Sequence, residues 1–272
     1  MYAFSTRFGV SESPSRLGSS PSSASSCLIR SCILLFYIST LTAQPAQRAR
    51  DASSTEADRL YADRANLSSA RRAANRWREE LAAGGSGAFD AAWKLARADY
   101  WLGGHSPEAE RRKQYEEGID AGRKAVALQP NCPAGYFWLA ANMGALAESF
   151  GLRQGIKYRK PIKDALLTVL RLDPAFQQGS ADRALGRWYY KVPGLFGGSH
   201  KLSEQHLRES LKFNEHSTAS HFFLAELFVD DGRKAEARVE LQKILDAPFD
   251  PDWAPEDREF KDKAQKLLAS LK

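Results

Sequence analysis

From residue 52 onward, apolar side chains recur every three or four positions, and Ala, Leu, Arg, Glu and Lys dominate the sequence. This spacing places apolar residues on one face of an α-helix, and the runs of β-branched residues that favour strands are rare. One such face passes through Leu60, Leu67, Ala74 and Leu81, until the Gly-rich residues 84–87 end it. We therefore predict an uninterrupted helix up to residue 83 and an all-α fold.

Glycine and proline divide the remaining pattern into further helices. A second helix is expected from Phe89, ended by Gly103 and Gly104. Pro107 stands where the first turn of a third helix would begin, and Pro255 stands at the start of the last one. Between these points the helices follow one another in pairs.

The helix pairs repeat along the chain. The ends of every second helix share a motif, which is AVALQPN at 125–131, VLRLDPA at 169–175 and SLKFNEH at 210–216, at offsets of 44 and then 41 residues. A repeat of this length is typical of stacked helical hairpins, in which each hairpin packs only on its neighbours.

The last pair fits the 34-residue tetratricopeptide pattern. The positions that match in register are Leu224, Ala225, Phe228, Gly232, Ala237 and Leu241. Earlier pairs share the same start, a Leu followed by a small residue, at Leu95, Leu139 and Leu185, with extra residues expected between their two helices. We predict a tetratricopeptide-like helical-hairpin solenoid with about four extended repeats and a C-terminal cap helix over residues 57–272. The alternative is an irregular helical bundle.

The N-terminal region has a different composition. Residues 1–26 are rich in Ser, Pro and Gly, Arg30 precedes the apolar run 33–41, and Ala43 follows that run. This order is typical of a secretory signal peptide, and the run is shorter than the roughly 20 residues of a transmembrane helix. We predict a signal peptide with a long Ser-rich leader over 1–43, a linker over 44–56, no membrane span after cleavage, and a periplasmic or secreted location. The alternative is an uncleaved N-terminal anchor.

Charge and cysteine content exclude several classes of protein. The chain has 39 Lys and Arg against 33 Asp and Glu, so its charge alone does not indicate nucleic acid, and we predict no nucleic-acid partner. Cys27 and Cys32 lie within the predicted signal peptide, which leaves Cys132 without an internal partner. Neither N-terminal cysteine stands at the end of the apolar run, where a lipid would be attached.

No catalytic motif emerges from the sequence. It contains no HExxH pair, no GxSxG motif and no P-loop lysine. Ser199, which follows two glycines, could help to bind an anion, but a helix N-cap is the better interpretation. We therefore predict a protein that is not an enzyme and that holds neither a metal nor a cofactor.

Three longer stretches resemble a known family. They are AWKLARADYWLGG at 92–104, GYFWLAANMG at 135–144 and ALGRWYYKVPGLFGGSHKLSEQHLRESL at 184–211. They are similar to the T-component family of TRAP transporters, and VPGLFGGS at 192–199 is the most distinctive part. A weaker likeness joins the chain to the regulator of microtubule dynamics family. The T-component resemblance implies an exported helical protein with a cleft or pore through its repeats, which assists uptake of small organic ligands together with a substrate-binding protein.

Candidate binding residues follow from the repeat register. The first helix of each pair should face the concave surface, where positions two and five after the repeated Leu are free to bind. Together with an arginine that precedes the third landmark, these positions include Arg97, Tyr100, Arg183, Arg187 and Tyr190. Such a set suits an anionic, partly apolar ligand. The alternative is that the tyrosines pack between helices and the arginines are solvated.

The VPGLFGGS segment adds Leu195 and Phe196 to the candidates, because a simple turn would carry polar residues there. They either pack on the neighbouring repeat or form the wall of a binding surface or subunit contact. Two functions stay open: an accessory protein that binds a small organic ligand, and a scaffold whose groove binds a peptide or partner protein. An enclosed aromatic cavity would favour the first, and a shallow groove the second. A homo-oligomer is compatible with both.

Overall fold

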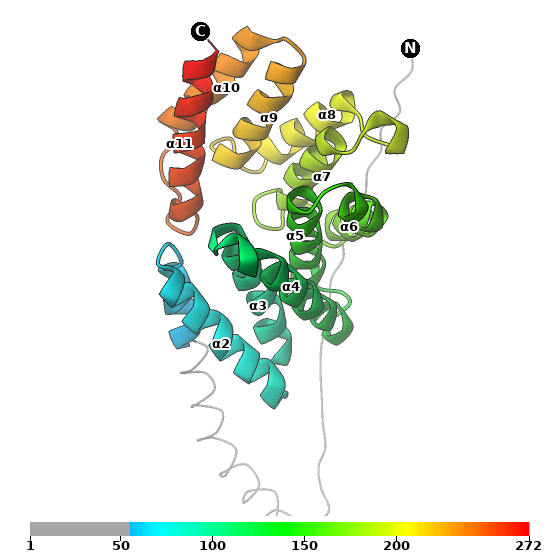
Figure 1. Ribbon diagram of the computed structural model, residues 1–272, viewed down its shortest axis with the longest axis vertical. Helices are drawn as coiled ribbons and strands as arrows, with labels where there is room; N and C mark the ends of the chain where they lie inside the picture. Colours follow the sequence, from blue (N-terminus) through cyan, green and yellow to red (C-terminus); the bar gives the residue numbers. More distant parts are fainter. Residues whose placement is uncertain (1–54, 272) are drawn as a thin grey trace, which may run out of the picture. The chain divides into compact units, whose positions relative to one another are not determined.

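The computed structural model describes residues 55–271, which form α-helices joined by turns and loops (Figure 1). No strand occurs in this part of the chain. The prediction of an all-α fold is therefore confirmed. The expected signal peptide, residues 1–43, and most of the expected linker, residues 44–56, lie outside the described residues.

The first helix differs from the prediction. Residues 55–62 are helical, but a turn separates them from α2 (Leu67–Ala83). The side chain of Asn66 caps α2 by accepting a hydrogen bond from the Ser68 amide at 3.0 Å. The indole of Trp101 donates to the carbonyl oxygen of Arg64 at 2.7 Å and ties the turn to the next helix. The expected uninterrupted helix is wrong because these polar contacts stabilise a break that the apolar pattern does not show.

The second and third helices are α3 (Ala88–His105) and α4 (Glu108–Leu128). Gly103 and Gly104 lie inside α3, so the prediction that they end the helix is wrong. A Cβ atom on Gly103 would lie 2.4 Å from the ring of Tyr115 on α4. This glycine is therefore required by the close approach of two helices and not by a turn.

Three more helix pairs and a final helix follow. Their bounds are α5 (Pro133–Ser149), α6 (Leu152–Leu172), α7 (Ser180–Lys191), α8 (His200–Leu211), α9 (Thr218–Asp230), α10 (Lys234–Asp246) and α11 (Ala254–Ser270). The extra residues of the first two repeats lengthen their helices, which are joined by two-residue links, so the expected insertion between helices is wrong there. It is right for α7 and α8, which flank residues 192–199 and a short 3-10 helix (Gly194–Phe196).

Small residues lie at the predicted contacts between helices. Ala96, Ala140, Gly186 and Ala225 are all buried. A Cβ atom on Gly186 would lie 2.5 Å from Cγ of Leu207, so α7 and α8 approach as closely as α3 and α4 do. One apolar core runs through α2 to α7 and contains most of the buried tryptophans, and a second core runs through α8 to α11.

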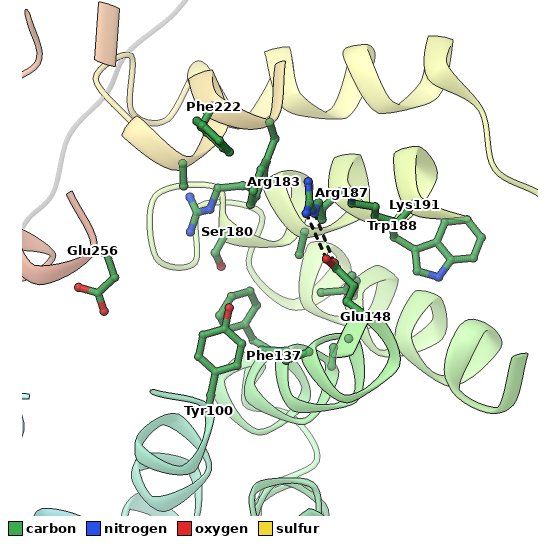
Figure 2. Close-up of a pocket in the computed structure, with 18 of the residues that line it drawn as sticks. Tyr100, Phe137, Glu148, Ser180, Arg183, Arg187, Trp188, Lys191, Phe222 and Glu256 are labelled. Carbon is green, nitrogen blue, oxygen red and sulfur yellow. Dashed lines mark hydrogen bonds and ion pairs between the residues drawn. The ribbon is translucent and has the colours of Figure 1, made fainter. Parts of the chain in front are cut away.

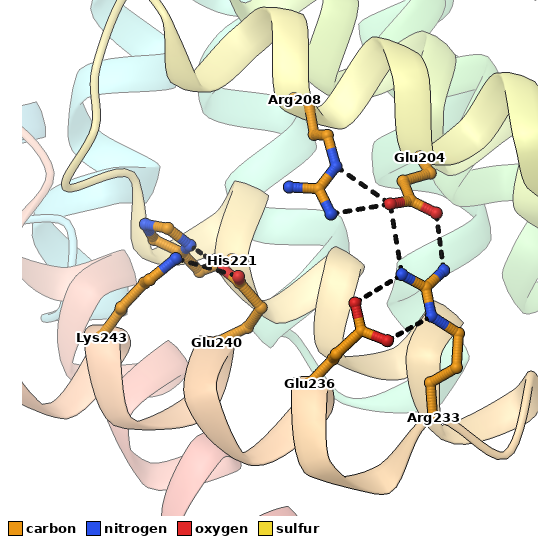
Figure 3. Close-up of polar contacts among 7 residues, drawn as sticks. All are labelled: Glu204, Arg208, His221, Arg233, Glu236, Glu240 and Lys243. Carbon is orange, nitrogen blue, oxygen red and sulfur yellow. Dashed lines mark hydrogen bonds and ion pairs between the residues drawn. The ribbon is translucent and has the colours of Figure 1, made fainter.

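Polar contacts stabilise the last repeat (Figure 3). Arg233 donates to Glu204 at 2.7 Å and to Glu236 at 2.6 Å, which joins α8 to the start of α10. The hydrogen bond from Arg233 holds the pKa of Glu204 below its usual value. Closer to the core, Glu240 contacts Nδ1 of His221 at 2.5 Å. The described C-terminal repeat therefore combines an apolar core with paired charges.

Candidate functional site

A cleft of about 1420 Å³ lies between the repeats. Its lining comes mainly from α3, α5, α6, α7, α9 and α11, and its aromatic residues include Trp138. Figure 2 shows four more of them, Tyr100, Phe137, Trp188 and Phe222. Ligand pockets usually measure roughly 300 to 1000 Å³ and are lined by apolar and aromatic side chains with a few polar groups. The cleft is therefore large enough for an organic ligand and has the expected lining.

The cleft brings together four of the seven candidate residues. Tyr100, Arg183, Arg187 and Phe196 line it, as do Ala141 and Gly144 from the corresponding positions of α5. Arg97, Tyr190 and Leu195 do not. The repeat register therefore locates the correct helix faces, while the binding role of each residue stays a prediction.

Arg183 is the unusual residue of the cleft. Its guanidinium group extends from α7 into the open space (Figure 2), and it forms no hydrogen bond or ion pair with any other described side chain. Burial lowers its pKa to about 10, an effect that the nearby Tyr100 hydroxyl only partly offsets. Arg183 is half-buried, so its charge is partly removed from water, and a charge in that position without a counter-ion is unfavourable. Among the described residues, this cation therefore lacks a partner.

The local backbone explains where Arg183 lies. Gly179 caps α7 with φ of 73°, and a Cβ atom there would lie 2.7 Å from the Phe213 ring. The hydroxyl of Ser180 donates to the carbonyl oxygen of Phe176 at 2.9 Å and fixes the first turn. At position 179, glycine is needed both for the backbone angle and for the contact with the end of α8. This start directs the next turn of α7, with Arg183, towards the cleft.

Arg187, one turn further along α7, is fully paired. It contacts Glu148 of α5 at 3.1 Å and Glu226 of α9 at 2.5 Å. Burial lowers the pKa of Arg187, but the two carboxylates outweigh burial and raise it overall. Arg187 therefore joins three repeats across the cleft. Because two carboxylates of the protein already neutralise it, it has little capacity left for a ligand.

Tyr100 lies on the opposite wall from Arg183. Its ring is 40% exposed and packs at 5.8 Å, centroid to centroid, against Trp138. Desolvation raises the pKa of its hydroxyl, which no other described residue engages in a hydrogen bond. Tyr100 therefore offers an uncharged donor and a ring face beside the unpaired arginine.

The three candidates outside the cleft have different environments. The guanidinium of Arg97 lies 4.1 Å from the centroid of the Tyr61 ring and 3.9 Å from Asp58. Tyr190 donates a hydrogen bond to Asp230 at 2.5 Å. Tyr190 thus packs between helices, as the alternative considered above expects, whereas Arg97, for which that alternative was solvation, packs against an aromatic ring. Leu195 is 91% exposed, so it does not pack on the neighbouring repeat.

Contacts of the N-terminal part of the described chain with its last helix escaped the sequence analysis. Arg64 contacts Glu256 of α11 at 2.5 Å and donates to the carbonyl oxygen of Asp252 at 2.6 Å. His105, at the end of α3, contacts Glu259 at 2.5 Å. These pairs join residues about 150 to 190 positions apart, which no local pattern relates. We name Arg64–Glu256 and His105–Glu259 the terminal clasp; Glu256 itself lines the cleft.

Other site types find no support in residues 55–271. No group of three His, Cys, Asp or Glu side chains there could hold a metal ion. Ser199 caps α8 by accepting from the Leu202 amide at 3.2 Å, as the preferred interpretation of the GGS turn predicted. Within the same residues, none of the helices has the length and apolar character needed to cross a membrane.

Comparison with known proteins agrees with this architecture of helical hairpins around a cleft. The model of the family described as regulator of microtubule dynamics protein 1-3 matches residues 54–196. The model of the family described as TRAP transporter T-component matches residues 128–272. Each match covers more than half of the chain, and the chain therefore belongs to both families, which overlap in its central repeats.

A solved structure supports the fold. A thermophilic tetratricopeptide protein from Thermus thermophilus, TTC0263, is 21% identical with a TM-score of 0.61, over 81% of this chain and 99% of that one. Two crystal structures of MamA are 16% and 15% identical, with TM-scores of 0.45 and 0.46; the matches cover 74% and 72% of this chain and 95% and 91% of those chains. No curated protein sequence matches the chain. The tetratricopeptide-like fold predicted from the repeats is confirmed.

Proposed function

We propose that this protein is an exported, non-enzymatic helical-repeat protein that holds a small organic anion in its cleft and serves a transport system as a T-component. The unpaired Arg183 in an aromatic cleft carries the proposal. A guanidinium group binds a carboxylate through two parallel hydrogen bonds, and such binding would supply the counter-ion that the free protein lacks. The aromatic walls would hold the apolar part of the same ligand.

The family supports the wider setting of this proposal. A T-component would act beside a substrate-binding protein, which is the protein partner we propose, and homo-oligomers are compatible with that role. Export requires that residues 1–43 are removed as a signal peptide. Mass spectrometry of the mature protein tests this step. Peptides from the Ser-rich leader in the exported fraction would contradict it.

Ligand binding is tested by calorimetry with aromatic and aliphatic monocarboxylates and their neutral amides. We expect the carboxylates to bind and the amides to bind weakly. Arg183→Gln should lower carboxylate affinity about 10- to 100-fold, because a charge-assisted hydrogen bond contributes about 1.5 to 3 kcal/mol. The free energy of unfolding of this variant should not fall, because no protein contact is lost.

Arg171→Gln is the matched control, since Arg171 is an exposed arginine of α6 outside the cleft. It should leave affinity unchanged. Equal binding of acids and amides, or equal binding by Arg183→Gln, would contradict the proposal.

The alternative function, a scaffold that binds a peptide, has one observation in its favour. The cleft exceeds the usual volume of a small-ligand pocket, so it has room for an extended segment. The same calorimetry separates the two functions when peptides with free and amidated C-termini are included. Tighter binding of peptides than of every small acid would favour the scaffold.

A further inference from the structure

The mouth of the cleft carries exposed apolar side chains that the ligand site does not require. On α6, Leu152 is 69% exposed and Ile156 is 52% exposed. On the 3-10 helix, Leu195 is 91% exposed and Phe196 is 39% exposed. We name these four residues the mouth patch. All but Leu195 line the cleft, so the patch is continuous with its rim.

The two segments of the patch lie against each other. The guanidinium of Arg159 on α6 lies 5.2 Å from the centroid of the Phe196 ring. The indole of Trp188 donates to the carbonyl oxygen of Arg159 at 3.0 Å, which fixes α6 against α7 (Figure 1). Apolar residues from separate parts of the sequence therefore form one surface.

The conformation of the 3-10 segment keeps Leu195 in solvent. Pro193 accepts hydrogen bonds from the Phe196 amide at 2.8 Å and from the Gly198 amide at 3.2 Å. Gly197 has φ of 97°, and a Cβ atom on Gly198 would lie 1.6 Å from the carbonyl oxygen of Val192. A fixed turn thus holds a large apolar side chain outward, where it contributes nothing to packing.

Basic residues are frequent in the two sequence segments that carry the mouth patch. Residues 150–163 contain five basic residues and no acidic one, namely Arg153, Lys157, Arg159, Lys160 and Lys163. Residues 183–203 also contain no acidic residue. Asp164 pairs with Lys160, Asp231 contacts His200 at 2.5 Å, and Glu148 and Glu226 pair with Arg187, so part of this charge is neutralised. The other four basic residues named on α6 form no ion pair with a described carboxylate, so the charge that remains there is positive.

We propose that the mouth patch docks on an anionic lipid bilayer, with the cleft opening toward it. Exposed Leu, Ile and Phe insert at the boundary between headgroups and acyl chains, while surrounding Lys and Arg bind anionic headgroups. A protein partner fits less well, because lysine is depleted in protein–protein interfaces. The inference goes beyond the proposed ligand site, since it concerns the surface around the cleft and not Arg183.

Co-sedimentation with vesicles tests the proposal. The full chain is mixed with vesicles of phosphatidylcholine alone or of phosphatidylcholine with phosphatidylglycerol, and every variant is made in the same chain so that the N-terminal region contributes equally. We expect binding to the anionic vesicles that weakens with salt. Leu195→Glu and Ile156→Glu should each lower it about tenfold or more, through lost insertion and added repulsion.

Val239→Glu is the matched control, because Val239 is 55% exposed on α10 and lies outside the cleft. It should bind vesicles like the unaltered chain, as should Arg183→Gln, which separates this proposal from the ligand site. Equal binding by Leu195→Glu, equal loss by Val239→Glu, or no preference for anionic vesicles would overturn the proposal. Loss of a co-purifying protein in Leu195→Glu without any vesicle binding would also overturn it, in favour of a protein interface.

Discussion

Two helix pairs of the same protein have different roles. The pair α9 and α10 has 13 residues in each helix, and α10 contributes no residue to the cleft. The pair α5 and α6 has helices of 17 and 21 residues, and its added turns near the link carry cleft residues such as Glu148, Ile156 and Arg159. The comparison teaches that a repeat of standard length borders the cleft with its first helix alone, through residues such as Phe222 and Glu226, while the added turns of a longer repeat bring its second helix to the cleft as well.

Glycines also have different roles in the helix contacts and in the cleft. In the packed contacts, a Cβ atom on Gly186 would collide with Leu207. Gly144, in the middle of α5, has no atom within 4 Å of the place a Cβ would occupy. Its absent side chain serves no helix contact and instead leaves space in the cleft. Small residues therefore mark close packing in one region and open volume in the other.

The largest effect should come from Ala225→Trp in α9. Ala225 is completely buried, so the added ring should lower the free energy of unfolding by about 1 to 3 kcal/mol or more and unfold the C-terminal pair first. Hydrogen exchange of α9 and α10 measures this. Ala141→Trp, at a half-buried cleft position of α5, is the control and should preserve folding while it fills the cleft. Unchanged protection in α9 with loss elsewhere would show that the repeat register is wrong.

The buried carboxylates of Asp99 in α3 and Glu240 in α10 extend the comparison between repeats to their electrostatics. Asp99 in α3 is fully buried, and neither carboxylate oxygen has a hydrogen-bond donor among the described residues. Burial raises its pKa from 3.8 to about 8, and Arg78 at 3.7 Å only partly opposes this. Because the folded pKa is raised, the charged form is unfavourable, and stability should fall as pH rises from about 4 to about 8.

Asp99→Asn should therefore raise the free energy of unfolding by about 1 to 3 kcal/mol above pH 8, with the gain absent near pH 4. Glu240 is the counterpart in the C-terminal pair. Burial raises its pKa, but contacts with His221 and Lys243 outweigh burial and lower it overall. Glu240→Gln should thus destabilise the protein at neutral pH and less so as pH falls below 4.5. Denaturant titrations across this pH range measure both, and a stabilising Glu240→Gln would contradict the comparison.

Two glycine substitutions should have opposite, smaller effects. Gly144→Ala should raise the free energy of unfolding by about 0.5 to 1 kcal/mol, because alanine favours the helix and meets no neighbour. Gly186→Ala should lower it, because the added Cβ displaces Leu207. Thermal unfolding of the two variants measures both changes in stability. Destabilisation by both would mean that Gly144 is also a packing contact.

The His105–Glu259 pair of the terminal clasp should give the smallest effect, since both of its residues are partly exposed. Burial lowers the pKa of His105, but its bonds to Glu259 and to the Trp101 carbonyl outweigh burial and raise it overall. Its contribution is therefore complete below pH 6.5 and is lost as pH rises through the raised pKa. Below about pH 4.5 the contribution of Glu259 declines in turn.

Hydrogen exchange of α11 should consequently accelerate at alkaline pH, after correction for the intrinsic pH dependence of exchange. His105→Gln should abolish this acceleration of exchange in α11. His216→Gln, at an exposed histidine between α8 and α9, should keep it. Equal acceleration in His105→Gln would assign the effect to another group.

The sequence by itself determined the helical class, the repeat register and the helix faces that border the cleft. These properties depend on spacing within one or two turns and on small residues at fixed steps, which are local. For this reason the landmarks led to Tyr100, Arg183 and Arg187, which line the cleft, while their binding role stays a prediction. The same local logic failed at the turn before α2 and at Gly103, where the deciding contacts come from Trp101 and from Tyr115 on another helix.

Only the tertiary structure decided which of the candidate cations stays free. Arg97 and Arg187 each stand two residues after a repeated Leu, and Arg183 stands two residues before one. Yet Arg97 lies against Tyr61 and Asp58, and Arg187 is paired by carboxylates from two other repeats. Pairing depends on which side chains the stacked hairpins bring within about 4 Å, and those partners are some 40 residues away in sequence. Arg183 is left unpaired for the same reason, because the packing of distant repeats places no carboxylate of residues 55–271 within ion-pair distance of it.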